Sequence, residues 1–213
     1  MRDALTSIAQ TLGVPLDERA LDRLMALCSL WLRYGRAMNL VGARDEASLL
    51  PHLGDGLATV ACAQRCLPLT EQTRWLDVGS GGGFPALIVA AVTPCALTLV
   101  EPRQKRASFL ELALGSIVDN GRVIRARADD VTWDENASEH ERGRYKASFS
   151  VATSRAVFAP DAWLEFGEKL VMDGGVLLAH LRADVDALAG RARDAEIVWE
   201  GSRIGAFRVP LRR

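Results

Sequence analysis

The most constraining feature of the sequence is a short apolar strand that runs directly into a run of glycines. The segment Trp75-Leu76-Asp77-Val78 is predicted to be a buried strand, and Gly79-Ser80-Gly81-Gly82-Gly83 follows it. A helix is predicted from about Pro85 to Val92. Glycine at such a position lets the backbone approach a ligand closely, because a Cβ atom would collide with the ligand or forbid the turn. This unit therefore predicts a ligand site beyond the carboxyl ends of the strands of a parallel sheet.

The alternation of strand and helix continues along the chain. Later strands are predicted at Ala96–Val100, Val123–Arg127, Phe149–Thr153 and, after a turn at Asp173-Gly174-Gly175, at Gly175–Leu181, with helices at Gln104–Val118 and Asp161–Leu170. Ile197-Val198-Trp199 and Phe207-Arg208-Val209 are predicted to close the sheet as a final hairpin. Strands that alternate with helices need crossover connections. We therefore expect a doubly wound α/β fold of Rossmann-like type, with a mostly parallel sheet.

The first 70 residues contain helix patterns and no strand pattern. Residues 17–35 place apolar side chains at helical spacing behind a predicted cap at Asp17, a shorter helix precedes them, and residues 46–66 are helix-like. We predict an N-terminal helical segment at residues 1–70 and an α/β domain at residues 71–213, which together form one structural unit. The charged stretch Asp134–Lys146 is predicted to be a loop.

Composition narrows the class of protein. A chain of 213 residues, 49% of them hydrophobic and 25% charged, is suited to one well-buried domain. It shows neither a secretory signal nor a membrane-spanning run, so we expect a cytoplasmic protein. A net charge of −1 gives no long-range attraction to a polyanion, although residues 101–127 carry a local excess of basic side chains. Buried free thiols rather than a zinc site are expected for the cysteines, which are Cys28, Cys62, Cys66 and Cys95.

The glycine spacing separates two classes of cofactor. Dinucleotide-binding loops read G-x-G-x-x-G, but the third glycine position here is Phe84. The pattern D-x-G-x-G-x-G that begins at Asp77 instead resembles the first motif of class I methyltransferases, which bind S-adenosylmethionine. Glu101, at the end of the second strand, can accept hydrogen bonds from ribose hydroxyls, and Asp129 follows the third strand near the expected adenine position. Because an acid such as Glu101 serves NAD equally well, a nucleotide-binding oxidoreductase remains the alternative.

The segment after the fourth predicted strand bears on the methyl acceptor. It reads Ala152-Thr153-Ser154-Arg155-Ala156-Val157. It therefore lacks the Asn- or Asp-Pro-Pro-aromatic run typical of enzymes that methylate exocyclic amines, and the cysteine needed for a pyrimidine carbon. A ring nitrogen with a free lone pair loses no proton and needs no base. An arginine without an obvious base is consistent with that acceptor.

Several motifs together resemble the glucose-inhibited division protein B family (GidB, also RsmG), whose members methylate ring nitrogen 7 of a guanine in small-subunit (16S) ribosomal RNA. The resemblance runs from about Trp31 to Val157. It rests on Asn39-Leu40 with Arg44-Asp45, His52-x-x-Asp55, the segment Asp77 to Pro85, Lys105-Arg106 followed by Phe109-Leu110, and Ser154-Arg155-Ala156.

The resemblance implies roles for individual residues. Arg155 would face both the cofactor and the incoming base and is the expected catalytic residue. The expected cofactor-binding residues are Asp77, Gly79, Gly81, Gly83, Phe84, Glu101, Ala128, Asp129 and Arg155. The expected substrate-binding residues are Asn39, His52, Asp55, Lys105, Arg106 and Ser154. S-adenosylmethionine would be the cofactor and the small ribosomal subunit the partner, and we expect no metal, no membrane and a monomer.

The sequence also departs from the family pattern. Gly56 stands where the family has a serine, Ser150 where it has an acid, and Ala179-His180-Leu181-Arg182 where it has a late lysine; the last 55 residues match poorly. These departures are at positions expected to contact the substrate rather than the cofactor. They leave two alternatives open, namely a relative that methylates another RNA or a small molecule, and a non-catalytic cofactor-binding protein that associates with ribosomal particles.

Overall fold

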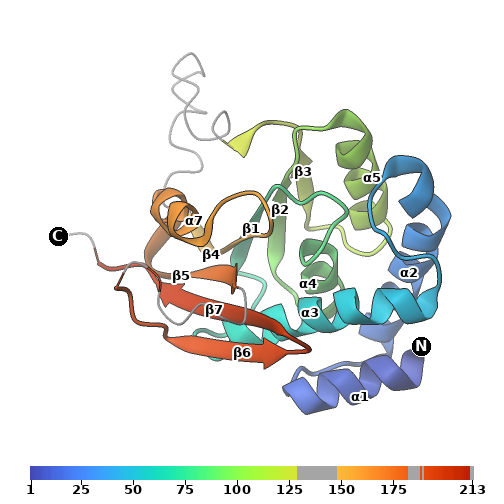
Figure 1. Cartoon of the computed structure of the whole chain (residues 1–213), viewed down its shortest axis with the longest axis horizontal. Helices are drawn as coiled ribbons and strands as arrows, with labels where there is room; N and C mark the ends of the chain where they lie inside the picture. Colours follow the sequence, from blue (N-terminus) through green and yellow to red (C-terminus); the bar gives the residue numbers. More distant parts are fainter. Residues whose placement is uncertain (129–147, 182–187, 189, 212–213) are drawn as a thin grey trace.

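A computed structural model describes residues 1–128, 148–181, 188 and 190–211. They form a seven-stranded sheet with the order β3-β2-β1-β4-β5-β7-β6 (Figure 1). The strands are β1 (Arg74–Val78), β2 (Ala96–Val100), β3 (Arg122–Ile124), β4 (Phe149–Ser154), β5 (Val171–Leu181), β6 (Ala195–Trp199) and β7 (Ser202–Arg208).

The sheet is mostly parallel, as the alternation of strands and helices predicts. Strands β3, β2, β1, β4 and β5 pair in parallel, whereas β7 is antiparallel to both β5 and β6. The chain order places β1 beside β4, and the carboxyl ends of these two strands lie next to each other, with Val78 paired to Ser154. This reversal of strand order is the position at which doubly wound sheets bind their ligands. The predicted fold class is therefore confirmed.

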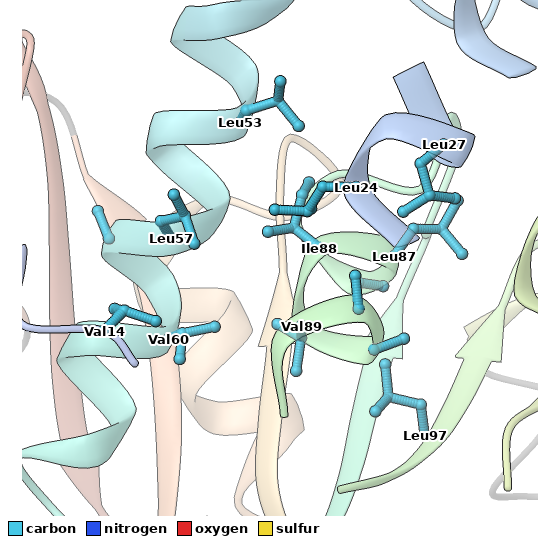
Figure 2. Packing of buried hydrophobic residues seen from close by; sticks show 14 of the residues in the cluster. Val14, Leu24, Leu27, Leu53, Leu57, Val60, Leu87, Ile88, Val89 and Leu97 are labelled. Carbon is cyan, nitrogen blue, oxygen red and sulfur yellow. The ribbon is translucent and has the colours of Figure 1, made fainter. Parts of the chain in front are cut away.

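Helices cover both faces of the sheet (Figure 1). One core joins helices α1 to α5 to one face, and a second core joins α7 to the opposite face. The helices are α1 (Arg2–Leu12), α2 (Glu18–Met38), α3 (Glu46–Gln64), α4 (Ala86–Val92), α5 (Gln104–Gly115) and α7 (Pro160–Gly167). In Figure 2, apolar side chains of α2, α3 and α4 point toward one another, among them Leu24, Leu57 and Ile88. The N-terminal helices thus share the core of the α/β unit.

Local signals set the ends of the long N-terminal helices. The Asp17 side chain accepts a hydrogen bond from the Ala20 amide at 2.7 Å and caps α2, as predicted. At its other end Asn39 takes the left-handed conformation, with φ 54°. Asp45 and Ser48 form a reciprocal capping box at the start of α3. These caps fix the short loop, residues 39–45, that joins α2 to α3.

Several predicted element boundaries were wrong. The expected turn at Asp173-Gly174-Gly175 lies inside β5, where a register shift opposite Phe149–Val151 forms an irregular bulge. Gly174, with φ 75°, supplies the left-handed residue that such a bulge needs, and this residue resembles a turn signal in sequence.

The other corrections concern the lengths of elements. The predicted helices at 104–118 and 161–170 end at Gly115 and Gly167, and the third strand ends at Ile124 rather than Arg127. The final hairpin is present, but its second strand begins at Ser202; this strand lies between β5 and β6. The predicted loop Asp134–Lys146 lies outside the described residues.

Candidate cofactor cleft

The loop after β1 is held against the end of β2 by main-chain hydrogen bonds. The amides of Gly79 and Ser80 donate to the carbonyl of Val100, at 2.8 and 3.1 Å. Gly79 has a φ of 75°, and a Cβ atom added to it would lie 2.2 Å from Cγ2 of Val157. A side chain at this position would therefore strain the backbone and displace the segment that follows β4. Only glycine allows the loop to pass this close to the end of β4.

Glu101 fastens the other side of the same loop. One of its carboxylate oxygens accepts from the amide of Gly81 at 2.9 Å, and the other accepts from the amide of Arg103 at 2.9 Å. The residue is 3% exposed. Since each carboxylate oxygen has a further lone pair, Glu101 can hold the loop and still accept a hydrogen bond from a ribose hydroxyl in the cleft. The predicted residue Glu101 therefore lines the cleft, with lone pairs available to a ligand.

Asp77 lies beneath the loop rather than in the cleft. The hydroxyl of Thr153 donates to the Asp77 carboxylate at 2.6 Å, and the indole N–H of Trp75 donates to Thr153 Oγ1 at 3.1 Å. Burial raises the pKa of Asp77 to about 6, while the hydrogen bonds from Thr153 and Ser80 act in the opposite direction. These groups join β1 to β4 under the glycine loop.

Two cavities meet above this loop. The larger, of about 530 Å³, extends to the loop between α2 and α3; the smaller, of about 400 Å³, extends to the end of β3 and includes Ala128 and Phe158. Both are lined by Gly79, Pro102, Arg103 and Val157, so they form one continuous cleft. An elongated nucleoside that carries an amino-acid chain fits such a cleft better than a compact ligand does.

Helix α2 supports the loop from the side. The indole N–H of Trp31 donates to the carbonyl of Gly82 at 2.7 Å, and the Trp31 ring stacks on Phe84 with 4.3 Å between centroids. The ring of His52, on α3, also contacts the ring of Phe84, at 5.1 Å between centroids. Burial and the nearby charge of Arg155 lower the pKa of His52. At neutral pH the mouth of the cleft therefore presents a flat, uncharged aromatic surface.

Arg155 lines the cleft beside the end of β1, and the side chains packed behind it complete a charged wall. Arg155, just after β4, places Nη1 3.0 Å from Oδ2 of Asp55 on α3. His180, near the end of β5, places Nδ1 3.7 Å from the same oxygen and Nε2 3.5 Å from Oγ1 of Thr59. Burial lowers the pKa of His180 to about 4. The His180 ring is therefore uncharged at neutral pH and lies beside the ion pair of Asp55 with Arg155.

The structure brings many of the predicted site residues to the cleft. Those that line it are His52, Gly79, Gly81, Phe84, Glu101, Arg106, Ala128 and Arg155. Arg106 also donates to the carbonyl of Asn39 at 3.1 Å, so Asn39 contributes its backbone rather than its exposed side chain. Lys105 is exposed one position earlier on α5.

Other predicted residues lie behind the cleft surface. Gly83 packs where a Cβ atom would lie 2.3 Å from Leu87, and the hydroxyl of Ser154 donates to the carbonyl of Val78 at 2.9 Å. The side chain of Asp55 is 5% exposed and forms an ion pair with Arg155. These residues, with Asp77, shape the cleft without lining it. Asp129 lies outside the described residues.

Sequence reasoning missed several residues of the site. The helical spacing of residues 17–35 predicts only an apolar packing role for Trp31, but its indole N–H donates to the glycine loop. The family pattern marks His180 only as a departure, although its position near the carboxyl end of a strand is a usable signal. Ala156 and Val157 also line the cleft, and Ala156 has the unusual φ of 59°. A left-handed alanine directly after Arg155 has no signal in sequence.

No helix of the described part of the chain is both long and apolar enough to cross a membrane. In the same residues, no cluster of three or more His, Cys, Asp or Glu side chains is arranged to hold a metal ion. All four cysteines are free, and burial raises the pKa of Cys28 to about 11 and that of Cys62 to about 12.

Comparison with known protein families shows the family of this chain. The model of the family described as "GidB: rRNA small subunit methyltransferase G" matches residues 20–202. The chain belongs to this family. Two relatives named ribosomal RNA small subunit methyltransferase G are each 33% identical to the chain. The relative from Leptothrix cholodnii aligns over 88% of this chain and 83% of its own length, and that from Polaromonas naphthalenivorans over 93% and 95%.

Solved structures support the fold. One is titled a putative protein-L-isoaspartate O-methyltransferase from Plasmodium falciparum in complex with S-adenosyl-L-homocysteine; it is 14% identical, covers 99% of this chain and 97% of its own, and has a TM-score of 0.55. A second, a mutant of MtNAS in complex with S-adenosylmethionine, is 14% identical, covers 98% of each chain and has a TM-score of 0.56. GidB membership makes this chain a methyltransferase that uses S-adenosylmethionine. The family and cofactor predicted from the sequence are confirmed.

Proposed function

We propose that this methyltransferase modifies ring nitrogen 7 of a guanine in small-subunit ribosomal RNA, with the small ribosomal subunit as its partner in the cytoplasm. The cofactor supplies an electrophilic methyl group on a sulfonium. The chain supplies a cleft in which Gly79 and Gly81 approach that cofactor and Glu101 accepts from its sugar. The relatives' names, which specify small-subunit ribosomal RNA, support the substrate class.

The side chains of the charged wall indicate which kind of acceptor atom the site can methylate. Displacement at a methyl group needs an aligned nucleophile and a site that excludes water, and it needs a base only if the acceptor loses a proton. Burial keeps His180 neutral at neutral pH, and the pKa of His52 is also lowered, so neither ring readily accepts and retains a proton there. Asp55 is paired with Arg155. These groups suit an acceptor with a free lone pair, such as nitrogen 7 of guanine.

The cleft mouth fits a flat base. Phe84 and His52 provide aromatic faces, and Arg155, whose side chain is 31% exposed, lines the same cavity. Unstacked bases in RNA are held by aromatic rings and by guanidinium groups that donate to their edges. The acceptor edge of guanine, with O6 and nitrogen 7, matches an arginine donor. We propose that Arg155 orients the base by this edge.

The rim of the cleft carries cations for the RNA backbone. Arg103 and Arg106 line the cleft, and Lys105 is exposed between them on the first turns of α5. Contacts of this kind position a nucleic acid without reading its sequence. The chain has a net charge of −1, so these local contacts, rather than attraction from the whole molecule, would place the substrate. An assembled subunit is therefore the preferred substrate in this proposal over naked RNA.

A transfer assay separates the candidate functions. Purified protein is incubated with methyl-labelled S-adenosylmethionine and small subunits from cells that lack this gene, followed by mass mapping of the RNA. Label on a guanine that is cleaved after reduction and aniline treatment, as nitrogen 7-methylated guanine is, supports the proposal. Label on other acceptors only would indicate a diverged relative. Cofactor binding without any transfer would indicate a non-catalytic protein.

Replacement of Arg155 tests the residue on which the acceptor argument depends. We expect Arg155→Ala to reduce transfer at least about 100-fold, because the base would lose its oriented donor. Binding of S-adenosylhomocysteine, measured by calorimetry, should remain within a few-fold, since Glu101 and the glycine loop are untouched. Arg19→Ala, at the exposed start of α2, is the control. A fully active Arg155→Ala enzyme would remove this residue from the mechanism.

A further inference from the structure

Asp55 is a buried carboxylate whose hydrogen-bonding capacity is unused. The residue is 3% exposed, and neither of its carboxylate oxygens has a hydrogen-bond partner among the described residues. It instead forms an ion pair with Arg155, whose Nη1 lies 3.0 Å from Oδ2 of Asp55. A buried carboxylate held in this way contributes little to stability, since the cost of its desolvation offsets its attraction to the cation. Its presence is better explained by what it does to Arg155.

Arg155 needs a counter-charge because of what the cleft binds. S-adenosylmethionine carries a positive sulfonium, and a guanidinium in the same partly buried cleft repels it. The described charged groups that face or underlie the cleft come from several elements. They are Asp55 on α3, Asp77 on β1, Glu101 after β2, Arg103 and Arg106 near the start of α5, Arg127 after β3, and Arg155 after β4. Asp55 is the acid in contact with Arg155.

His180 completes this arrangement from β5. Its ring lies 3.7 Å from Asp55 and 3.5 Å from Thr59, and Thr59 already donates its hydroxyl proton to the carbonyl of Asp55 at 2.8 Å. An uncharged ring at this position fills the space behind the carboxylate and adds no positive charge. A lysine at the same position would give the wall a net positive charge.

We propose that Asp55 is a positioning residue that orients Arg155 into the cleft and offsets its charge, and that the neutral ring of His180 keeps this wall electrically balanced for a cationic cofactor. The proposal rests on the placement of Arg155 at the methyl-transfer site and on the cofactor, but not on the identity of the RNA target. It concerns a property that can be measured without RNA. Its success or failure is therefore distinguishable from that of the proposed function.

The test compares two ligands that differ in one charge. S-adenosylmethionine is a sulfonium, whereas S-adenosylhomocysteine is an uncharged thioether at the same atom. The measured quantity is the ratio of their dissociation constants from calorimetry on the purified full chain. Because both ligands bind the same folded protein, this ratio is independent of the fraction that is folded. A variant that only loosens the structure weakens both ligands together and leaves the ratio unchanged.

Asp55→Asn removes the negative charge and keeps the shape of the side chain. We expect it to raise the ratio of the dissociation constant of S-adenosylmethionine to that of S-adenosylhomocysteine about tenfold. This is the size of effect expected for one unit charge several ångströms away in a partly buried site. The matched control is Glu46→Gln, which removes the same charge from the exposed first turn of the same helix and should leave the ratio unchanged. An unchanged ratio in Asp55→Asn would overturn the proposal.

Replacement of His180 tests the balance from the other direction. His180→Lys adds a positive charge while Asp55 is retained, and it should raise the ratio in the same direction. His180→Asn adds no charge and should leave the ratio as it is in the wild type, whatever its effect on stability. An equal shift of the ratio in both His180 variants would show that this position acts through packing. No shift in either variant would show that charge at this position does not affect the ratio. Either result would overturn the assignment of His180.

Discussion

The two walls of the cleft are held in place by different kinds of interaction. The glycine wall, residues 79–83 with Glu101, is held by main-chain hydrogen bonds to β2 and by close packing at Gly79. The charged wall, Asp55 with Arg155 and His180, is held by side-chain contacts between three elements, and the carboxylate of Asp55 has no aligned hydrogen bond within the described residues.

This difference separates two kinds of requirement. A wall made of backbone fixes where a ligand lies, and almost any added atom disturbs it. A wall made of side-chain charges sets the electrical environment of the reacting atoms, and single charges change it without moving the backbone. We therefore expect substitutions in the glycine wall to weaken both cofactor forms alike. Substitutions in the charged wall should distinguish between the two forms.

Glu101→Gln should have the largest effect. An amide group can accept from only one of the amides of Gly81 and Arg103 and faces the other with a second donor. We expect S-adenosylhomocysteine and S-adenosylmethionine both to bind about 100-fold more weakly by calorimetry, since two charge-assisted hydrogen bonds are disturbed. Glu111→Gln, on the exposed side of α5, is the control. A loss of less than about threefold would mean that Glu101 is not required for the wall.

Asp77→Asn tests the support beneath the glycine wall. Burial raises the pKa of Asp77 from 3.8 to about 6, so the folded protein prefers the protonated form. As the pH rises through this window the unfolded chain ionises first, and the wild type loses stability. The Asn variant avoids this cost. Its free energy of unfolding should exceed that of the wild type by about 3 kcal/mol above pH 6 and by little near pH 4.

Urea unfolding at several pH values measures this difference. Asp45→Asn is the control of opposite sign, because hydrogen bonds from Ser48 lower the pKa of Asp45. The Asp45 carboxylate therefore stabilises the folded protein above its ordinary pKa, and this contribution is lost as the pH falls. If the advantage of Asp77→Asn is independent of pH, then ionisation of this group does not limit stability.

Trp31→Phe tests the contact between α2 and the glycine wall. Phenylalanine retains a ring to stack on Phe84 but cannot donate to the carbonyl of Gly82. We expect a loss of about 1 kcal/mol in stability and binding of both cofactor forms that is a few-fold weaker. Trp199→Phe is the matched control, because the Trp199 indole N–H is buried without a hydrogen-bond partner in the described structure. Equal losses in the two variants would attribute the effect to ring size.

Lys105→Gln should have the smallest effect and lies on the rim, outside both walls. Loss of one phosphate contact should raise KM for small subunits about two- to threefold at moderate salt, with kcat and both cofactor affinities unchanged. The salt dependence of substrate binding should become shallower. Arg19→Gln, an exposed charge change at the start of α2, should show neither effect. A change in cofactor affinity would place Lys105 in the cleft rather than on its rim.

The two walls also differ in how far the sequence predicts them. The glycine wall follows from local signals, because the strand, the glycines and Glu101 occur within one β-loop-α-β unit. The same kind of signal predicts most strand and helix positions. It fails where a local pattern has two meanings, as at Gly174, whose left-handed conformation serves a bulge inside β5 instead of a turn between elements.

The charged wall is a matter of tertiary contact. Asp55, Arg155 and His180 come from α3, the end of β4 and β5, and no periodicity or spacing connects them. Family resemblance indicates the first two residues separately, but the ion pair between them and the position of His180 behind it depend on how α3 packs across β5 and β7. Contacts between distant elements of this kind follow from the three-dimensional packing and not from local propensity.

The position of β7 has a consequence for the synthesis of this enzyme. The last strand of the sheet in chain order is inserted between β5 and β6, so β6 has no hydrogen-bonded neighbour until β7 arrives. During translation, the glycine loop and its neighbours emerge before β7, whereas β5, which carries His180, keeps an open edge until β7 has been made. A nascent chain would therefore acquire its methyl-donor pocket before its sheet is closed. Competence for the full reaction should appear only after β7 has emerged from the translating ribosome.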